Sequence, residues 1–359
     1  MLCRCALLAL LLAPLVATGD APFYPDKSNL LVYLDARALP HAVKRPGEWS
    51  VRRAHILENM QRVMGPLPER RSLPLDLEVL ATEDLPRFRR QKITFVSERR
   101  ASDGRPDRVP AFLLIPRDLK YRRPAPGLLC LHQTTTRGKA EPAGLGPNPD
   151  LAYAAELAQR GYVTLAPDYP NFGDYVFDPY ENGYASATMK GIANHRRALD
   201  LLQSLPEVDP ARLGAVGHSL GGHNALFVAA FDPRVKAVVS SCGFNSFAKY
   251  MRGDLTGWSH KGYMPRIAEL FGRDPARMPF DFTEVLGAIA PRPVFVNAPI
   301  GDRNFEVSGV RDCVAAALPV YDSVFRARGR LEAIYPKAEH SFPPEARRAA
   351  YAFLDRWLR

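Results

Sequence analysis

The stretch Gly217-His218-Ser219-Leu220-Gly221-Gly222 decides the fold of this chain. It follows a short apolar run at 212–216 and precedes a helix-like run at 223–230. A strand, a sharp turn and a helix with the pattern G-x-S-x-G are typical of a nucleophile elbow, in which the turn lifts the serine hydroxyl above a sheet. Both glycines of the pattern lie where a Cβ would collide with neighbouring backbone. We therefore interpret Ser219 as a nucleophile, with a glycine-rich turn and an incidental serine as the alternative.

Strand-like and helix-like segments alternate on both sides of this turn. Strands are expected at 75–81, 91–97, 109–115, 126–132, 162–167, 235–241, 293–297 and 331–335, and helices at 49–64, 152–160, 186–205, 309–326 and 345–358. This alternation predicts an α/β fold with a mostly parallel central sheet and helices on both faces. Residues 244–286 interrupt the alternation, and we expect a lid-like insertion there.

The beginning of the chain has the pattern of an export signal. Arg4 precedes a nearly continuous apolar run at 6–17, and Ala17-Thr18-Gly19 forms a small-x-small cleavage site. We interpret 1–19 as a signal peptide, with a membrane anchor as the alternative, and expect a secreted or periplasmic protein without stable membrane insertion. The 359 residues, 47% of them hydrophobic, then suit an N-terminal extension with an edge helix (20–70) and one catalytic α/β domain (71–359).

Charge and cysteine content exclude several classes of function. The formal net charge is +10, but the arginines are scattered and no basic stripe is interleaved with aromatic residues. We interpret this as a solvated basic surface and expect no nucleic-acid partner. Cys130, Cys242 and Cys313 follow the signal peptide without a C-x-x-C pair or metal-ligand spacing, so we expect no metal and no disulfide scaffold. Any single disulfide and the oligomeric state stay open.

A serine nucleophile needs a base within hydrogen-bond reach and an acid that orients the base. Functional groups of open α/β sheets gather in the loops that follow the strands. Asp302 follows the expected strand 293–297, and His340 follows the expected strand 331–335. We predict that His340 is the base and Asp302 the acid. Glu306 is the nearest alternative acid, with Asp312 behind it.

The oxyanion of an acyl-transfer reaction needs two backbone donors. The N–H of Leu220, directly after the nucleophile, is the first candidate. The second is expected in the loop after the strand 126–132, where Gln133 stands in place of a glycine. The N–H of Gln133 or of Thr134 can serve, and His132 is interpreted as a buried structural histidine.

Aromatic and polar side chains in two segments suit a sugar ring. The insertion contains Trp258, His260 and Tyr263, and the loop 168–175 contributes Phe172 from the opposite wall. We predict that these four residues bind substrate. The alternative is that the insertion residues form a lid core that does not touch ligand.

These motifs make the chain similar to the esterase branch of the α/β-hydrolases. Segments 111–116, 128–132, 162–170 and the elbow resemble dienelactone-hydrolase-like and acetyl-xylan-esterase-like enzymes, and 278–294 resembles glucuronoyl-esterase-like carbohydrate esterases. Two features depart from these families. Leu220 stands where many glucuronoyl esterases carry an arginine, and dienelactone hydrolases use a cysteine in place of Ser219.

The resemblance implies a serine hydrolase that cleaves carboxylic esters through an acyl-enzyme, without a metal or organic cofactor. Its expected substrate is a small-molecule or polysaccharide ester, carrying acetyl or uronoyl groups. Two alternatives remain. The first is a serine peptidase of the prolyl-oligopeptidase type, which shares the order Ser, Asp, His but carries a large N-terminal domain that this sequence lacks. The second is a non-catalytic binding protein with a hydrolase fold.

Overall fold

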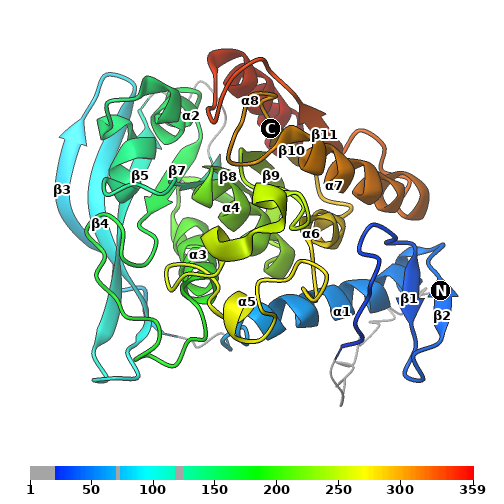
Figure 1. Ribbon diagram of the computed structural model, residues 1–359. Helices are drawn as coiled ribbons and strands as arrows, with labels where there is room; N and C mark the ends of the chain where they lie inside the picture. The colour runs from blue at the N-terminus through cyan, green and yellow to red at the C-terminus, as the bar shows by residue number, and fades with distance from the viewer. Residues whose placement is uncertain (1–20, 70–72, 118–123) are drawn as a thin grey trace, which may run out of the picture.

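A nine-stranded sheet runs through the computed structural model, which describes residues 21–69, 73–117 and 124–359 (Figure 1). The strand order is β11-β10-β9-β8-β6-β7-β5-β4-β3. The six strands from β11 to β7 are parallel, whereas β5, β4 and β3 join antiparallel at one edge. The predicted mostly parallel sheet is therefore confirmed. The predicted signal peptide, 1–19, lies outside the described residues.

The elements have the following bounds. The strands are β1 (Val32–Leu34), β2 (Pro40–Ala42), β3 (Glu78–Asp84), β4 (Phe88–Arg99), β5 (Pro106–Pro116), β6 (Ala125–Leu131), β7 (Val163–Pro167), β8 (Val208–His218), β9 (Val235–Ser241), β10 (Val294–Asn297) and β11 (Leu331–Ile334). The helices are α1 (Pro46–Met64), α2 (Tyr153–Gln159), α3 (Ala187–Ser204), α4 (Leu220–Phe231), α5 (Arg266–Glu269), α6 (Phe282–Ile289), α7 (Val307–Pro319) and α8 (Pro344–Leu358).

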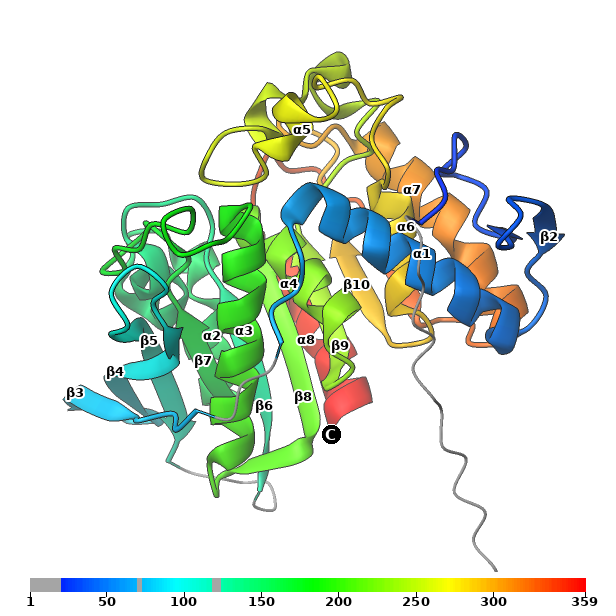
Figure 2. The ribbon, with the colours of Figure 1, turned by 90° about the horizontal axis from the view of Figure 1, so that it is seen from below.

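Helices cover both faces of the sheet (Figure 2). Along β6, successive side chains alternate between the faces, as the pleat of a strand requires. Leu129 and Leu131 pack in the core with α3, α4 and α6, whereas Leu128 and Cys130 pack with α2 and α8. Because both faces are buried, the strand reads as a continuous apolar run. No helix within the described ranges is long and apolar enough to cross a membrane.

Three segments differ from the sequence prediction. The helix expected at 309–326 ends as α7 at Pro319 and continues as a wider turn over Val320–Val324, at the point where proline removes a backbone donor. The segment before α1, where no strand is expected from the sequence, contains the short antiparallel pair β1 and β2. The insertion expected at 244–286 ends in α6, a helix whose residues are all buried against α1, α4 and α7.

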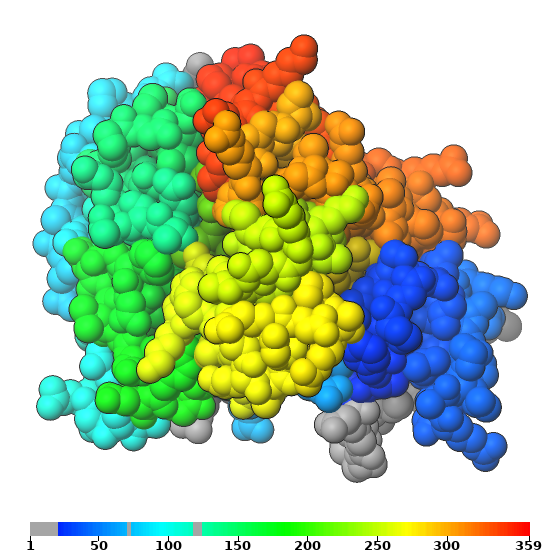
Figure 3. All heavy atoms as spheres, viewed as in Figure 1, coloured from blue at the N-terminus to red at the C-terminus, as the bar shows by residue number. Residues whose placement is uncertain are grey.

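The insertion before α6 lies on the face of the molecule that Figure 3 shows, beside the N-terminal residues. A buried ion pair joins these N-terminal residues to the part of the chain that forms the large sheet and its helices. Arg52 of α1 pairs with Glu284 of α6, and neither side chain is exposed. The Arg52 guanidinium also lies 3.4 Å from the ring centroid of Tyr24. A single partner removed from such a pair leaves an uncompensated buried charge, so the extension is part of the fold.

Asp281, the N-cap of α6, makes the stability of the fold depend on pH. Its carboxylate accepts hydrogen bonds from the N–H groups of Phe247 and Phe282, yet burial raises its pKa to about 7, with Glu284 adding to the rise and Lys27 opposing it. The folded state therefore holds a proton here between about pH 4 and pH 7 that the unfolded state has released. The ionised carboxyl thus costs stability as pH rises through this range.

We expect Asp281→Asn to remove this dependence, because asparagine caps helices as well as aspartate does and does not titrate. The melting temperature of the variant minus that of the wild type is then larger at pH 8 than at pH 5. Thermal unfolding at both pH values checks this. An offset between the two proteins that does not change with pH would contradict it.

Candidate active site

Ser219 lies at the sharp turn between β8 and α4. Its φ is 55° and its ψ is −118°, a conformation that a non-glycine residue adopts only when its surroundings enforce it. The N–H of Ser219 donates to the carbonyl of Ser241 at 2.8 Å, and its carbonyl accepts from the N–H of Gly222 at 2.8 Å. The residue is 9% exposed, so neighbouring residues cover most of its surface.

The two glycines of the motif are required by close backbone contacts. A Cβ on Gly217 would lie 2.1 Å from the carbonyl oxygen of Gly221, and a Cβ on Gly221 would lie 1.8 Å from that of Leu131. Both separations are far below van der Waals contact. The strand that ends in Leu131 and the start of α4 can therefore approach each other only where these side chains are absent, which explains the spacing read from the sequence.

Asp302 and His340, from the loops after β10 and β11, are hydrogen-bonded to each other. His340 Nδ1 lies 2.9 Å from Asp302 Oδ2, and the other carboxylate oxygen accepts from the N–H groups of Asn304 and Phe305. Burial opposes ionisation of Asp302, but these hydrogen bonds and the charge of His340 outweigh it and hold its pKa below the usual value. Asp302 is therefore an ionised acceptor fixed by three donors.

The alternative acids lie differently. Glu306 is exposed and caps α7 by accepting from the N–H and hydroxyl of Ser308. Asp312 pairs with Lys249 at 2.6 Å on the surface. Each carboxylate already has a local structural partner, and the carboxylate that contacts His340 is that of Asp302.

A buried polar network beneath His340 was not foreseen from the sequence. The ring centroid of His218 lies 5.0 Å from that of His340, and His218 Nδ1 lies 3.0 Å from Ser241 Oγ. Asn297 donates both to Ser241 Oγ and to the carbonyl of Ser341. Burial, followed by the charge of His340, lowers the pKa of His218 to about 3, so this ring stays neutral. A polar residue ending the apolar strand β10 was the one signal of this network.

The backbone donors predicted for the oxyanion are unpaired. In the described part of the chain, the N–H groups of Leu220, Gln133 and Thr134 donate to no protein acceptor. Leu220 begins α4, whose N-terminal N–H groups favour negative charge. These N–H groups remain available to a ligand oxygen.

Trp258 lies in the core, which corrects the prediction that it contacts substrate. It is 2% exposed, and its ring packs against His223 at 4.8 Å, Phe282 at 5.4 Å and Phe305 at 6.0 Å between centroids. Its indole therefore has no free face for a sugar ring. An aromatic residue in a loop gives no sequence signal of which way it points, and the alternative of a lid core holds for this residue.

The other three residues predicted to bind substrate lie nearer the surface. His260 is exposed and packs on Tyr263, with ring centroids 4.3 Å apart. Tyr263 reaches the oxyanion loop, where its hydroxyl lies 2.7 Å from Thr134 Oγ1. Phe172 is half-buried, and Tyr263 and Phe172 both pack against a small cluster that contains Leu220. Leu220 itself is only 1% exposed, so the leucine that stands in place of the arginine is a buried member of this cluster.

Three residues with metal-binding atoms meet at the site. Ligand atoms of Cys242, Asp302 and His340 lie within 4.8 Å of one another. The Cys242 thiol, however, donates to the carbonyl of Ser341 at 3.3 Å, and both carboxylate oxygens of Asp302 accept hydrogen bonds. The thiol and the carboxylate that could bind a metal are thus engaged in hydrogen bonds within the protein. The three described cysteines are free thiols.

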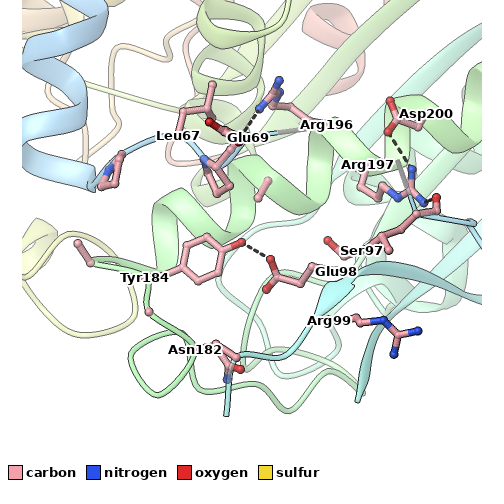
Figure 4. A pocket seen from close by; sticks show the side chains of 17 residues that line it. Leu67, Glu69, Ser97, Glu98, Arg99, Asn182, Tyr184, Arg196, Arg197 and Asp200 are labelled. Carbon is pink, nitrogen blue, oxygen red and sulfur yellow. Dashed lines mark hydrogen bonds and ion pairs between the residues drawn. The ribbon is translucent and has the colours of Figure 1, made fainter. Parts of the chain in front are cut away.

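A hollow of about 410 Å³ lies away from these residues. Figure 4 shows its lining side chains on β4, on α3 and on the segments that contain Leu67 and Asn182. Arg197, one of its lining residues, donates to Asp200. None of the predicted site residues lines it, so it does not mark the reaction centre.

With the site described, its class can be stated: the fold and the elbow are those of an α/β-hydrolase. The family model for fungal glucuronyl esterases matches residues 174–324. The curated protein named "Putative hydrolase YtaP" of Bacillus subtilis (strain 168) is 28% identical over 320 residues, which cover 85% of this chain and 100% of that protein.

Two further relatives carry more specific names. The 4-O-methyl-glucuronoyl methylesterase 1 of Wolfiporia cocos is 24% identical over 59% of this chain and 53% of its own length. The solved glucuronoyl esterase from Solibacter usitatus has a TM-score of 0.68 at 18% identity, over 94% of this chain and 98% of its own. These similarities confirm the prediction of a carboxylic-ester hydrolase in the esterase branch of the α/β-hydrolases.

Proposed function

We propose that this protein is an exported serine esterase that cleaves carboxylic esters of carbohydrates. The observation that carries the proposal is the hydrogen-bonded pair of Asp302 and His340 at the same sheet edge as the strained elbow of Ser219. These are the base, the orienting acid and the nucleophile of an acyl-transfer reaction, in the chain order of α/β-hydrolases.

In the proposed reaction, His340 Nε2 takes the proton of the Ser219 hydroxyl as the oxygen attacks the acyl carbon. The N–H of Leu220 and one from the Gln133–Thr134 segment stabilise the oxyanion. His340 returns the proton to the departing alcohol, and an acyl-enzyme remains. Water, deprotonated by His340, then attacks the acyl carbon; the bond to the Ser219 oxygen breaks, this oxygen takes the proton back from His340, and the acid is released. Asp302 holds the imidazole with its Nδ1 proton toward the carboxylate and stabilises the imidazolium.

A carbohydrate substrate is supported by the relatives and by the rim of the site. Exposed basic residues stand on four of the loops that carry predicted site residues: Arg137, Lys261, Arg303 and Lys337. A basic rim suits an acidic polysaccharide such as a uronate-bearing xylan, because it attracts the polymer over the range of a Debye length. The proposal of export rests on the signal-like residues 1–19. N-terminal sequencing of the secreted protein tests it, and residue 20 is the expected first residue.

A substrate panel tests the proposal. We expect turnover of 4-nitrophenyl acetate and of at least one of glucuronate methyl ester and acetylated xylan, with no turnover of aminoacyl-4-nitroanilides. Preference for the anilides would instead support the peptidase alternative. Absence of both turnover and fluorophosphonate labelling of Ser219 would support the non-catalytic binding protein.

A further inference from the structure

The oxyanion loop is fixed at one point by His132. The His132 Nε2 atom accepts a hydrogen bond from the N–H of Tyr169 at 3.0 Å, so the proton of the neutral ring is on Nδ1. Burial lowers the pKa of His132 and keeps the ring neutral. Its Nδ1–H donates to the carbonyl of Gln133 at 2.6 Å. This contact sets the plane of the peptide bond between Gln133 and Thr134.

That peptide plane determines which donor faces the ligand. In a trans peptide the N–H of one residue points opposite to the carbonyl of the residue before it. Since the Gln133 carbonyl points at the His132 ring, the Thr134 N–H points away from that ring. Thr134 is exposed, and its N–H donates to no protein acceptor in the described part of the chain. Thr134 therefore presents a fixed, unpaired donor.

The same residue is held on its other side by the insertion. The Tyr263 hydroxyl lies 2.7 Å from Thr134 Oγ1, across 129 positions of sequence. Tyr263 is in turn well anchored. Its carbonyl accepts from the N–H of Thr188 in α3, and its ring packs edge-on against His223 with centroids 5.8 Å apart.

The turn that carries Tyr263 is tied down by two other tyrosines. Tyr169 donates to the carbonyl of Gly262 at 3.1 Å, and Tyr180 donates to the carbonyl of Lys261 at 2.5 Å. Only the phenol of Tyr263, among these three, contacts the oxyanion loop. The turn is therefore a rigid support from which one hydroxyl reaches Thr134.

We infer that Thr134 supplies the second oxyanion N–H and that Tyr263 is the positioning residue that fixes it, so that the insertion controls the rate of acyl transfer. The inference rests on the proposed esterase function and deepens it. Preorganised donors act through their exact placement, and small displacements reduce catalysis strongly. The insertion thereby contributes to the chemical step as well as to substrate binding.

Tyr263→Phe tests this inference with 4-nitrophenyl acetate, a substrate too small to need the sugar-binding rim. We expect kcat to fall about tenfold while KM changes less than about twofold, because the lost contact acts on the transition state. Thr134→Val gives a similar loss, Thr134→Ser restores most of the rate, and the double variant is no slower than either single one. Additive losses, or an unchanged kcat in Tyr263→Phe, would overturn the inference.

Two controls separate positioning from general loosening. Tyr180→Phe removes a phenol hydroxyl from the same turn without touching Thr134, and we expect kcat within about twofold of the wild type; an equal loss there would overturn the specific role of Tyr263. The second control is 4-nitrophenyl thionoacetate, whose sulfur accepts hydrogen bonds weakly. We expect the ratio of kcat for 4-nitrophenyl acetate to kcat for the thionoacetate to be smaller in Tyr263→Phe than in the wild type. Lack of turnover of 4-nitrophenyl acetate by the wild type would instead refute the proposed function.

Discussion

Ser219→Ala is expected to lower kcat for 4-nitrophenyl acetate by about 10⁴-fold or more, which is the scale of loss when a catalytic serine is removed. The remaining activity comes from binding and from the oxyanion donors, which the substitution leaves in place. Alanine retains the Cβ at φ 55°, so the strained turn is unchanged. The Ser219 side chain makes no capping hydrogen bond to α4, and its loss therefore leaves no partner unsatisfied.

The melting temperature of Ser219→Ala is accordingly expected to match that of the wild type to within about 2 °C. Ser204→Ala is the matched control, since it deletes the same hydroxyl at the far end of α3, where the group donates to the carbonyl of Leu201. This control is expected to keep full activity. A fluorophosphonate probe, read by intact-protein mass, labels the wild type and the control but not Ser219→Ala. Retention of a tenth of the wild-type rate by Ser219→Ala would refute the nucleophile.

The part of the fold that sequence could predict is the part that local pattern determines. The strand expected at 235–241 is β9, Val235–Ser241, because a short apolar run bounded by polar residues has few alternatives. The elbow was recognisable because close backbone contacts, of Gly217 with Gly221 and of Gly221 with Leu131, leave no room for a Cβ at the two glycines. The alternation of strands and helices then sufficed for the parallel sheet.

Tertiary contacts decided what the pattern could not. Trp258 and Tyr263 belong to the same loop and have similar composition around them, yet one is buried and the other meets Thr134. The helix α6 was placed in the insertion because nothing local shows that Glu284 would pair with Arg52, 232 positions earlier. The polar contacts of Asn297 likewise join segments 44 or more positions apart. Period and propensity contain no information about such pairs.

The candidate acid and base were predictable from strand order, and their contact was not. Asp302 was one of three carboxylates after β10 that a sequence reading could assign to His340. In the structure, the hydrogen bond of 2.9 Å and the two backbone donors on the other oxygen distinguish it from Glu306 and Asp312. The role of Asp302 in the reaction remains a prediction, and substitution tests it directly.

Asp302→Asn is expected to lower kcat by about 10³–10⁴-fold with little change in fold. The asparagine carbonyl can still accept from the N–H groups of Asn304 and Phe305, so the loop keeps its geometry. The amide nitrogen then faces His340 Nδ1 and, being a donor, stabilises the tautomer whose proton is on Nε2. That tautomer cannot take the proton of Ser219. The neutral amide also gives no stabilisation to the imidazolium that forms during attack.

Glu306→Gln is the matched control for this prediction. It makes the same change from carboxylate to amide four positions away, and Glu306 caps α7 through Ser308 on the exposed surface. We expect kcat within about threefold of the wild type, with at most about 1 kcal/mol of stability lost from the cap.

Because the pKa of Asp302 already lies below its usual value, lowering the pH to 5 does not protonate it, and the ratio of wild-type to Asp302→Asn rates stays large there. A mild effect at Asp302 together with a large one at Glu306 would transfer the role of the acid to Glu306.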